Sequence, residues 1–270
     1  AAGAYFKDCF TALGLPEGTV EYIWTSDFVD DKDYWEKVVR VMKATSLKRT
    51  LRAMPIMGRR ADSVDVESAW ALYPALQTSD IFHMELDVAA AGMDQRKVHM
   101  LAREVAPKLG YKPPVCLHNS LLPGLQDATI EGVFDEDETI NKTIRGKMSK
   151  SAGKGAIWVN DTPKEIKAKY RAAFCPEKLV EGNPVIDHAR LVIFPNLGEL
   201  NIERPAKYGG DLSFQSFEEL AQVYRKGELH PLDLKNGISA GMVELLAPVA
   251  EYFEKNPENL ARMRELRVTR

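Results

Sequence analysis

Residues 86–117 constrain the fold more than any other part of the chain, because two short apolar runs flank one amphipathic stretch. The apolar runs are residues 86–90 and 114–117, and residues 94–109 between them follow a helical period. Gly110 comes next, and glycine is common where a helix ends. A strand, a helix and a second strand in this order are typical of a parallel sheet that binds ligands beyond the carboxyl ends of its strands. The sequence therefore predicts an α/β fold.

The residues before this unit predict three helices and one more strand. Helical patterns cover residues 1–13, 31–52 and 64–81. Residues 20–24 are apolar and rich in β-forming residue types, which favours a buried strand. The alternation of strands and helices therefore extends toward the start of the chain.

The later part of the chain follows a mainly helical pattern. Thr162 and Glu165 have the spacing of a capping box, with Pro163 at the first helical position. Further helices are expected at residues 184–194, 216–226 and 232–254 and after Pro257. We expect an α/β domain in residues 1–160 and a helical domain in residues 161–270.

The composition fits a soluble globular protein, with 45% hydrophobic residues, 28% charged residues and a net charge of −3. A charge so near balance argues against a protein that binds DNA through its overall charge, and no apolar run has membrane-spanning length. The three cysteines are widely spaced and lack the pattern of metal ligands, so reduced thiols are expected. We expect a cytoplasmic protein without a metal site, and with neither DNA nor a membrane as partner.

Residues 146–155, called the lysine loop below, combine two lysines with small and flexible residues. Met148 and Ser149 separate Lys147 from Lys150, and glycines flank the group. Two ammonium groups in such a loop can neutralise the charge that builds up on a departing pyrophosphate. Most segments rich in lysine, serine and glycine are solvated basic loops, and on the residues alone this interpretation stays open.

Three polar side chains share one face of the helix expected at residues 64–81. Tyr73, Gln77 and Asp80 stand at positions i, i+4 and i+7. They either pack with their polar atoms paired by neighbours or line a pocket for a small zwitterion, and Gln95 at the next helix start would reach the same pocket. The spacing alone favours packing.

Several stretches resemble the tyrosyl-tRNA synthetases of the archaeal and eukaryotic type, which are class I aminoacyl-tRNA synthetases. The most specific are YPALQTSD at residues 73–80 and KMSKS at residues 147–151. The other matching stretches are residues 87–97, 115–119, 123–125, 180–184 and 230–236. The resemblance runs over essentially the whole chain. It implies a Rossmann-like parallel-sheet catalytic domain, with a dimer-interface insertion at about residues 31–70, followed by a mainly α-helical anticodon-binding domain.

The resemblance also implies the roles of individual residues in the catalytic domain. Tyr73, Gln77 and Gln95 would hold the α-amino group of L-tyrosine, and Asp80 would bind its phenol. The catalytic residues would be Lys147 and Lys150, through the pyrophosphate of ATP. The implied ATP site also contains His118, Leu125, Met148 and Ser149.

The implied reaction begins with attack of the tyrosine carboxylate on the α-phosphorus of ATP. It yields tyrosyl-adenylate, and the tyrosyl group then passes to the 3′ end of tRNA(Tyr). Positioning and charge stabilisation carry such a reaction. ATP would act as a substrate with Mg²⁺, and no tightly bound cofactor is expected.

In the helical part, the resemblance assigns Tyr208, His230 and Asp233 to the anticodon. An exposed aromatic ring can stack on an unpaired base, and a carboxylate can accept hydrogen bonds from guanine. Without the resemblance, a loop aromatic and a helix start with an acidic first turn explain the same residues. His83, His99 and His188 lie on helical faces and are expected to be packing residues.

The family pattern is not complete in this chain. Class I synthetases carry a His-containing signature at the first strand-to-helix turn, and no such motif occurs here. We expect a fragment of a longer enzyme, with one half of a duplicated enzyme or an inactive copy as alternatives. A homodimer is expected from the resemblance. The competing functions are a non-catalytic RNA-binding or signalling module and a tryptophanyl-tRNA synthetase.

Overall fold

The computed structural model describes residues 1–15, 18–53, 67–126 and 155–266. These residues form two compact units. The α/β unit consists of the described residues within Tyr22–Leu121. The helical unit combines Ala1–Glu21 with the described residues from 122 onward.

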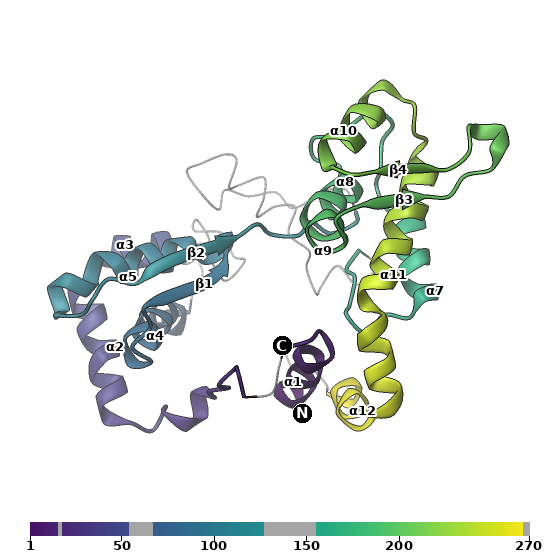
Figure 1. Cartoon of the computed structure of the whole chain (residues 1–270). Helices are drawn as coiled ribbons and strands as arrows, with labels where there is room; N and C mark the ends of the chain where they lie inside the picture. Colours follow the sequence, from purple (N-terminus) through teal and green to yellow (C-terminus); the bar gives the residue numbers. More distant parts are fainter. Residues whose placement is uncertain (16–17, 54–66, 127–154, 267–270) are drawn as a thin grey trace. The chain divides into compact units, whose positions relative to one another are not determined.

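The α/β unit contains a parallel pair of strands. β1 (Val88–Gly92) pairs with β2 (Val115–Asn119) from the first residue of each strand to the last. The short 3-10 helix η3 (Met93–Gln95) and the helix α5 (Arg96–Leu109) connect the two strands, and α5 ends at Gly110 with a φ of 81°. This left-handed conformation favours glycine, since other side chains are strained there. The predicted strand–helix–strand unit is confirmed (Figure 1).

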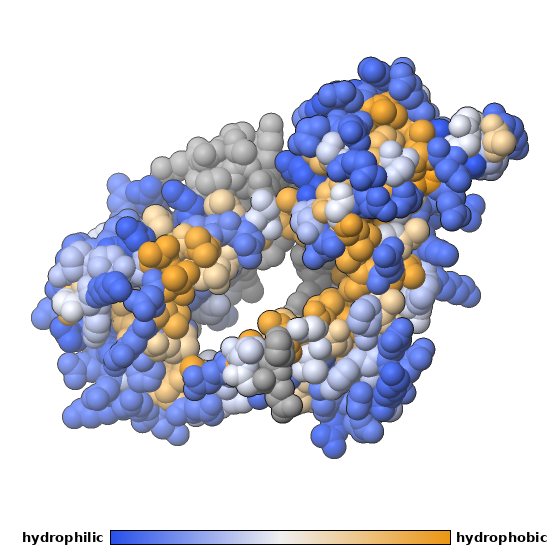
Figure 2. Space-filling view, in the orientation of Figure 1, coloured by the Kyte–Doolittle hydropathy of each residue, from blue (hydrophilic) through white to orange (hydrophobic). Residues whose placement is uncertain are grey.

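Three further helices pack in this unit: α2 (Lys32–Ala44), α3 (Leu47–Ala53) and α4 (Ser68–His83). The buried side chains of α2 are spaced along one helix face and join the core formed with α4 and α5. They are Tyr34, Val38 and Val41. Figure 2 shows apolar side chains at the surface over β1 and β2, where Val88, Val115 and Leu117 are exposed.

Two predictions for this unit are wrong. Residues 31–52 form two helices instead of one, because the Ser46 hydroxyl accepts a hydrogen bond from the Arg49 amide at 3.2 Å and so starts a second helix. Residues 20–24 form no strand, and the side chains of Ile23 and Trp24 are exposed. A run of β-forming residues needs a neighbouring strand for its backbone groups, and none of the described strands pairs with it.

The long helix α11 (Pro231–Lys255) is the centre of the helical unit. Against it pack α7 (Pro163–Arg171) and β3 (Leu200–Ile202), which forms an antiparallel hairpin with β4 (Leu212–Phe214). The other elements are α8 (Pro184–His188), the π-helix η5 (Ala189–Ile193), α9 (Phe194–Leu197), the 3-10 helix η6 (Ala206–Tyr208), α10 (Phe217–Lys226) and α12 (Glu258–Glu265). The helices predicted for this part are confirmed, whereas the hairpin was not predicted.

The capping box predicted at the start of α7 is present. The Thr162 hydroxyl accepts from the Glu165 amide at 3.3 Å, and the Glu165 carboxylate accepts from the Thr162 amide at 2.8 Å. Threonine, proline and glutamate in the right order fix this start locally, which explains why the sequence predicts it.

The first helix belongs to the helical unit. The Tyr5 ring of α1 (Ala2–Ala12) stacks on Phe253 of α11 at 5.5 Å, and the Tyr5 hydroxyl donates to Asn160 at 2.6 Å. The contacts thus divide the chain differently from the boundary predicted near residue 160, since residues 1–21 and 122–126 join the C-terminal helices. Long-range packing places residues 1–21 with the C-terminal helices, and no local sequence pattern predicts this.

Candidate functional site

The helix α4 carries the predicted polar face. It is helical from Ser68 to His83, so Tyr73, Gln77 and Asp80 lie on successive turns of one face. Tyr73 is exposed, whereas Gln77 and Asp80 are half-buried among apolar neighbours. Half-buried polar groups among apolar neighbours require partners, and the partners define the site.

Gln77 meets Gln95 across the α/β unit. The Gln77 amide nitrogen donates to the Gln95 carbonyl oxygen at 2.9 Å, although 18 positions separate the two residues. Gln95 is the last residue of η3, which directly follows β1. It therefore lies at the edge of the sheet where the strands end. The Gln77 carbonyl oxygen is buried and accepts no hydrogen bond from any described residue. A buried acceptor without a donor is costly, so this oxygen is suited to an N–H or O–H group of a ligand.

The Asp80 carboxylate has a partner that the sequence did not reveal. The Tyr34 hydroxyl of α2 donates to Oδ1 of Asp80 at 2.8 Å. Burial raises the pKa of Asp80, and the hydrogen bond from Tyr34 and the charge of His83 oppose that rise. Burial also raises the pKa of Tyr34, which therefore stays protonated and donates. The sequence does place a tyrosine on the apolar face of α2, which indicates a buried hydroxyl that needs an acceptor. It does not show which acceptor this hydroxyl meets.

His118 lies on β2 and pairs with another histidine. Nε2 of His118 is 3.1 Å from Nδ1 of His99, which is buried on α5. Burial lowers the pKa of His99, and the neighbouring His118 lowers it further. The pKa of His118 is lowered by burial and then by Arg96. Neutral imidazoles satisfy this contact, because one nitrogen donates and the other accepts.

The edge at the end of β1 is tightly filled. A Cβ atom added to Gly92 would lie 2.6 Å from Oδ1 of Asp94 and 2.8 Å from Cδ2 of Leu121. A side chain at this position, directly before the residues that lead to Gln95, would require the side chains of Asp94 and Leu121 to shift. The site therefore lies at the carboxyl end of the parallel pair, where α/β folds bind their ligands.

Of the other residues predicted for the ATP site, Leu125 is the one that the structure describes. Leu125 is fully buried in the helical unit, where its amide donates to the Gly155 carbonyl at 2.9 Å and its carbonyl accepts from the Phe174 amide at 2.8 Å. The remaining four predicted residues are outside the described part of the chain: Lys147, Met148, Ser149 and Lys150.

The predicted anticodon residues lie in the helical unit. Tyr208, at the end of η6, is 60% exposed, and the Lys207 ammonium lies 4.8 Å from the centre of its ring. Gly209 and Gly210 follow with φ values of 100° and 76°, which only glycine adopts readily. An exposed ring beside a cation offers a face on which a base can stack.

His230 and Asp233 lie at the start of α11. Nδ1 of His230 accepts from the Leu232 amide at 3.1 Å, so this side chain caps the helix. Asp233 stands in the first turn, where a negative charge is favourable. The helix start that explains these residues without the family resemblance is thus present, with His230 as its cap.

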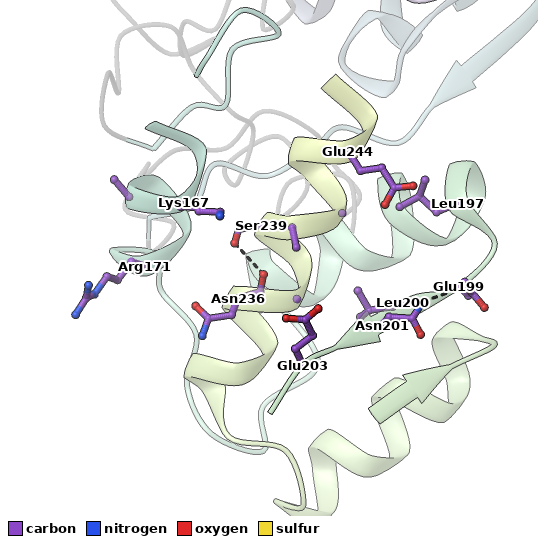
Figure 3. A pocket seen from close by; sticks show the side chains of 14 residues that line it. Lys167, Arg171, Leu197, Glu199, Leu200, Asn201, Glu203, Asn236, Ser239 and Glu244 are labelled. Carbon is purple, nitrogen blue, oxygen red and sulfur yellow. Dashed lines mark hydrogen bonds between the residues drawn. The ribbon is translucent and has the colours of Figure 1, made fainter. Parts of the chain in front are cut away.

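A groove in the helical unit was not predicted. It has a volume of about 880 Å³ and lies between α7, β3 and α11 (Figure 3). Lys167 and Arg171 line it from α7, and Glu203 and Glu244 from the segments across. Side chains of both charge signs line the groove, so it selects no simple class of ion.

Within the described residues, no group of three or more histidine, cysteine or acidic side chains could hold a metal ion. None of the described helices combines the length and apolarity needed to cross a membrane.

Comparison with known proteins adds a family match. The sequence model of one protein family, the class I tRNA synthetases for tryptophan (W) and tyrosine (Y), matches residues 4–247. The tyrosine–tRNA ligase of Thermococcus kodakarensis is 43% identical over 98% of this chain and 74% of the relative. The ligase of Aeropyrum pernix is 44% identical over 92% of this chain and 68% of the relative.

Solved structures give the same relationship. The structure of tyrosyl-tRNA synthetase from Pyrococcus horikoshii complexed with L-tyrosine matches with a TM-score of 0.87 and 39% identity, over 97% of this chain and 73% of that one. The tryptophanyl-tRNA synthetase of Aeropyrum pernix matches with a TM-score of 0.64 at 17% identity, over 92% of this chain and 61% of that one, which shows the fold alone.

Proposed function

Because this chain belongs to the class I tRNA synthetases for tryptophan and tyrosine, and within them to the tyrosine–tRNA ligases, we propose how its residues serve that reaction. The enzyme activates L-tyrosine with ATP and transfers the tyrosyl group to tRNA(Tyr). The tryptophan-specific branch is less supported, because its matching structure shares only 17% identity with this chain.

The observation that carries the pocket proposal is the pair of acceptors on α4. The buried Gln77 carbonyl oxygen has no donor among the described residues, and Asp80 on the next turn is a carboxylate held by Tyr34. L-Tyrosine brings two donors, an ammonium group and a phenol hydroxyl. Gln77 binds the ammonium group together with Gln95 and Tyr73, and Asp80 binds the phenol.

ATP is the second substrate. His118 at the end of β2 lies beside the adenine, together with the backbone leading to Leu125. Lys147 and Lys150 of the lysine loop neutralise the pyrophosphate as it departs, and Met148 and Ser149 between them complete the contact. Mg²⁺ accompanies the phosphates, as is usual for nucleoside triphosphates.

The helical unit reads the anticodon in this proposal. The exposed ring of Tyr208 stacks on the first anticodon base, Asp233 accepts hydrogen bonds from that base, and His230 assists. The predicted division of the chain into a catalytic domain and an anticodon-binding domain is part of this proposal.

The α/β unit also offers a surface for a second copy of the chain. Exposed apolar side chains lie along α2 and α3: Trp35, Val39, Met42, Leu47 and Leu51. Apolar stripes of this kind usually mark a protein interface, and identical subunits most often form two-fold dimers. We propose a homodimer through this stripe. Because tRNA charging supplies translation, we place the enzyme in the cytoplasm.

Tyrosine-dependent exchange of pyrophosphate into ATP tests the proposed function. The full-length protein is expected to catalyse exchange with L-tyrosine and to reject L-phenylalanine. Asp80→Ala is expected to abolish this selectivity, because it removes the acceptor for the phenol. Absence of exchange in the wild type would support a non-catalytic RNA-binding module, and unchanged selectivity in Asp80→Ala would remove the pocket assignment.

A further inference from the structure

The Tyr34 side chain is a fixed part of the α/β core. It is 1% exposed and lies on the buried face of α2 with Val38 and Val41. The Phe28 ring packs edge-on against the Tyr34 ring, with 4.8 Å between the ring centres. The His83 ring of α4 also packs against the Tyr34 ring, with 5.3 Å between the centres. A ring enclosed in this way cannot turn away from Asp80 without disturbing the core.

The hydrogen bond from Tyr34 divides the two oxygens of Asp80 between two roles. Oδ1 accepts from the Tyr34 hydroxyl at 2.8 Å, and Oδ2 accepts no hydrogen bond from the described residues. The Tyr34 hydroxyl is the donor, since its proton is retained in this environment. The carboxylate is therefore held in one orientation, with one oxygen left for a ligand.

Few other charged or titratable groups act on Asp80. His83 lies one turn further along α4, and its Nδ1 is 3.3 Å from the Lys37 ammonium of α2. Among the described residues, Tyr34 and His83 are the groups that act on the Asp80 carboxylate. Tyr34 is the one in direct contact, so it has the larger part in fixing the carboxylate as an acceptor.

An ionised carboxylate accepts hydrogen bonds and cannot donate them. Its free oxygen therefore favours a substrate side chain that ends in a donor, such as a phenol hydroxyl. A substrate that ends in a phenyl ring would leave the half-buried oxygen without a partner, which is costly. The discrimination depends on the carboxylate staying ionised and correctly oriented.

We propose that Tyr34 is a positioning residue for amino-acid selectivity, which occupies Oδ1 of Asp80 and so reserves Oδ2 for the phenol of the substrate. The proposal rests on the proposed function, because it takes Asp80 as the phenol acceptor. Tyr34 itself does not touch the substrate.

The variant Tyr34→Phe tests this proposal in the full-length protein, because it removes the hydroxyl and keeps the packed ring. In pyrophosphate exchange we expect the KM for L-tyrosine to rise about tenfold or more, the range for loss of a hydrogen bond to a charged group. The preference for L-tyrosine over L-phenylalanine should fall with it, and the KM for ATP should not change. The acid limb of the KM for L-tyrosine should also move to higher pH, because Asp80 loses a bond that favours its ionised form.

Tyr5→Phe is the matched control. It also removes one buried phenol hydroxyl, which donates to Asn160 at 2.6 Å in the helical unit. We expect it to leave the KM for L-tyrosine, the selectivity and the pH profile unchanged. A merely structural role of Tyr34 would instead change the KM values for L-tyrosine and ATP together and leave the pH profile in place, which would overturn the proposal.

The outcomes separate this inference from the proposed function. If the wild type shows exchange and Asp80→Asn loses selectivity while Tyr34→Phe behaves as wild type, only the role of Tyr34 is refuted. If the wild type shows no exchange, or Asp80→Asn keeps full selectivity, the pocket assignment and the role of Tyr34 both fail.

Discussion

Acidification is expected to destabilise the helical unit through His188. This side chain is fully buried at the end of α8. Its Nε2 is 2.8 Å from the Pro123 carbonyl oxygen, and its Nδ1 is 2.6 Å from the Tyr170 hydroxyl. A carbonyl oxygen only accepts, so Nε2 carries the proton and Nδ1 accepts from Tyr170. The neutral ring is therefore fully satisfied, and a second proton would have to displace the bond from Tyr170.

The size of the effect follows from the pKa of His188. Burial lowers it from 6.5 to about 4, against the opposing influence of the Pro123 carbonyl. The unfolded chain thus binds a proton that the folded chain refuses. The neutral His188 ring therefore stabilises the folded state. This contribution to the free energy of unfolding is fully present above pH 6.5 and is lost as the pH falls from 6.5 toward 4. The difference between the two pKa values corresponds to about 3 kcal/mol, of which about 2 kcal/mol is lost between pH 7 and pH 5.

Urea unfolding followed by circular dichroism at several pH values between 5 and 8 measures this loss. The comparison protein is His188→Gln, whose amide can donate to Pro123 and accept from Tyr170 but does not titrate. Contributions from His99 and His118, whose pKa values are also lowered, are common to both proteins and cancel. The wild type should lose about 2 kcal/mol more than His188→Gln between pH 7 and pH 5. Parallel pH curves for the two proteins would refute the reasoning.

Three further predictions concern the helical unit. Gly237→Ala should lower the free energy of unfolding by about 1–3 kcal/mol in urea titrations, because its Cβ would lie 2.6 Å from Cγ1 of Ile202. Gly241→Ala, whose closest neighbour would be 3.2 Å away, should lower it less, and an equal loss would contradict the steric account. Thr162→Ala removes the cap of α7 and should cost about 1 kcal/mol, measured in the same way; an unchanged urea midpoint would contradict it. Asp233→Ala should weaken charging of tRNA while sparing pyrophosphate exchange, and equal losses in both assays would argue against separate sites.

The elements that the sequence predicted correctly are those with complete local signals. Gly110 ends α5 in a left-handed conformation, and Thr162 with Glu165 starts α7, so neighbouring residues are enough to predict both boundaries. The hairpin of β3 and β4 was missed because each strand has only three residues, too few to show an alternating period. The grouping of α1 with α11 was missed because it depends on contacts between the two ends of the chain.

The site shows the same distinction between local and distant information. Gln77 and Asp80 were predicted from their positions on one helix face and from family resemblance, and the contact between Gln77 and Gln95 follows from the order of strand, turn and helix. The partner of Asp80 was not predictable, because Tyr34 precedes it by 46 positions and the phenol has no fixed partner in sequence.

Selectivity in this pocket is therefore expected to depend on the packing of α2 against α4 as well as on the residues that contact the substrate. Tyr34 is held by Phe28 and His83, so a change that shifts these rings would move the hydroxyl away from Oδ1 of Asp80. The carboxylate would then lose a bond that favours its ionised, fixed form, although no group in contact with the substrate had changed. If Tyr34 has the proposed role, the amino-acid preference of the enzyme depends partly on its hydrophobic core.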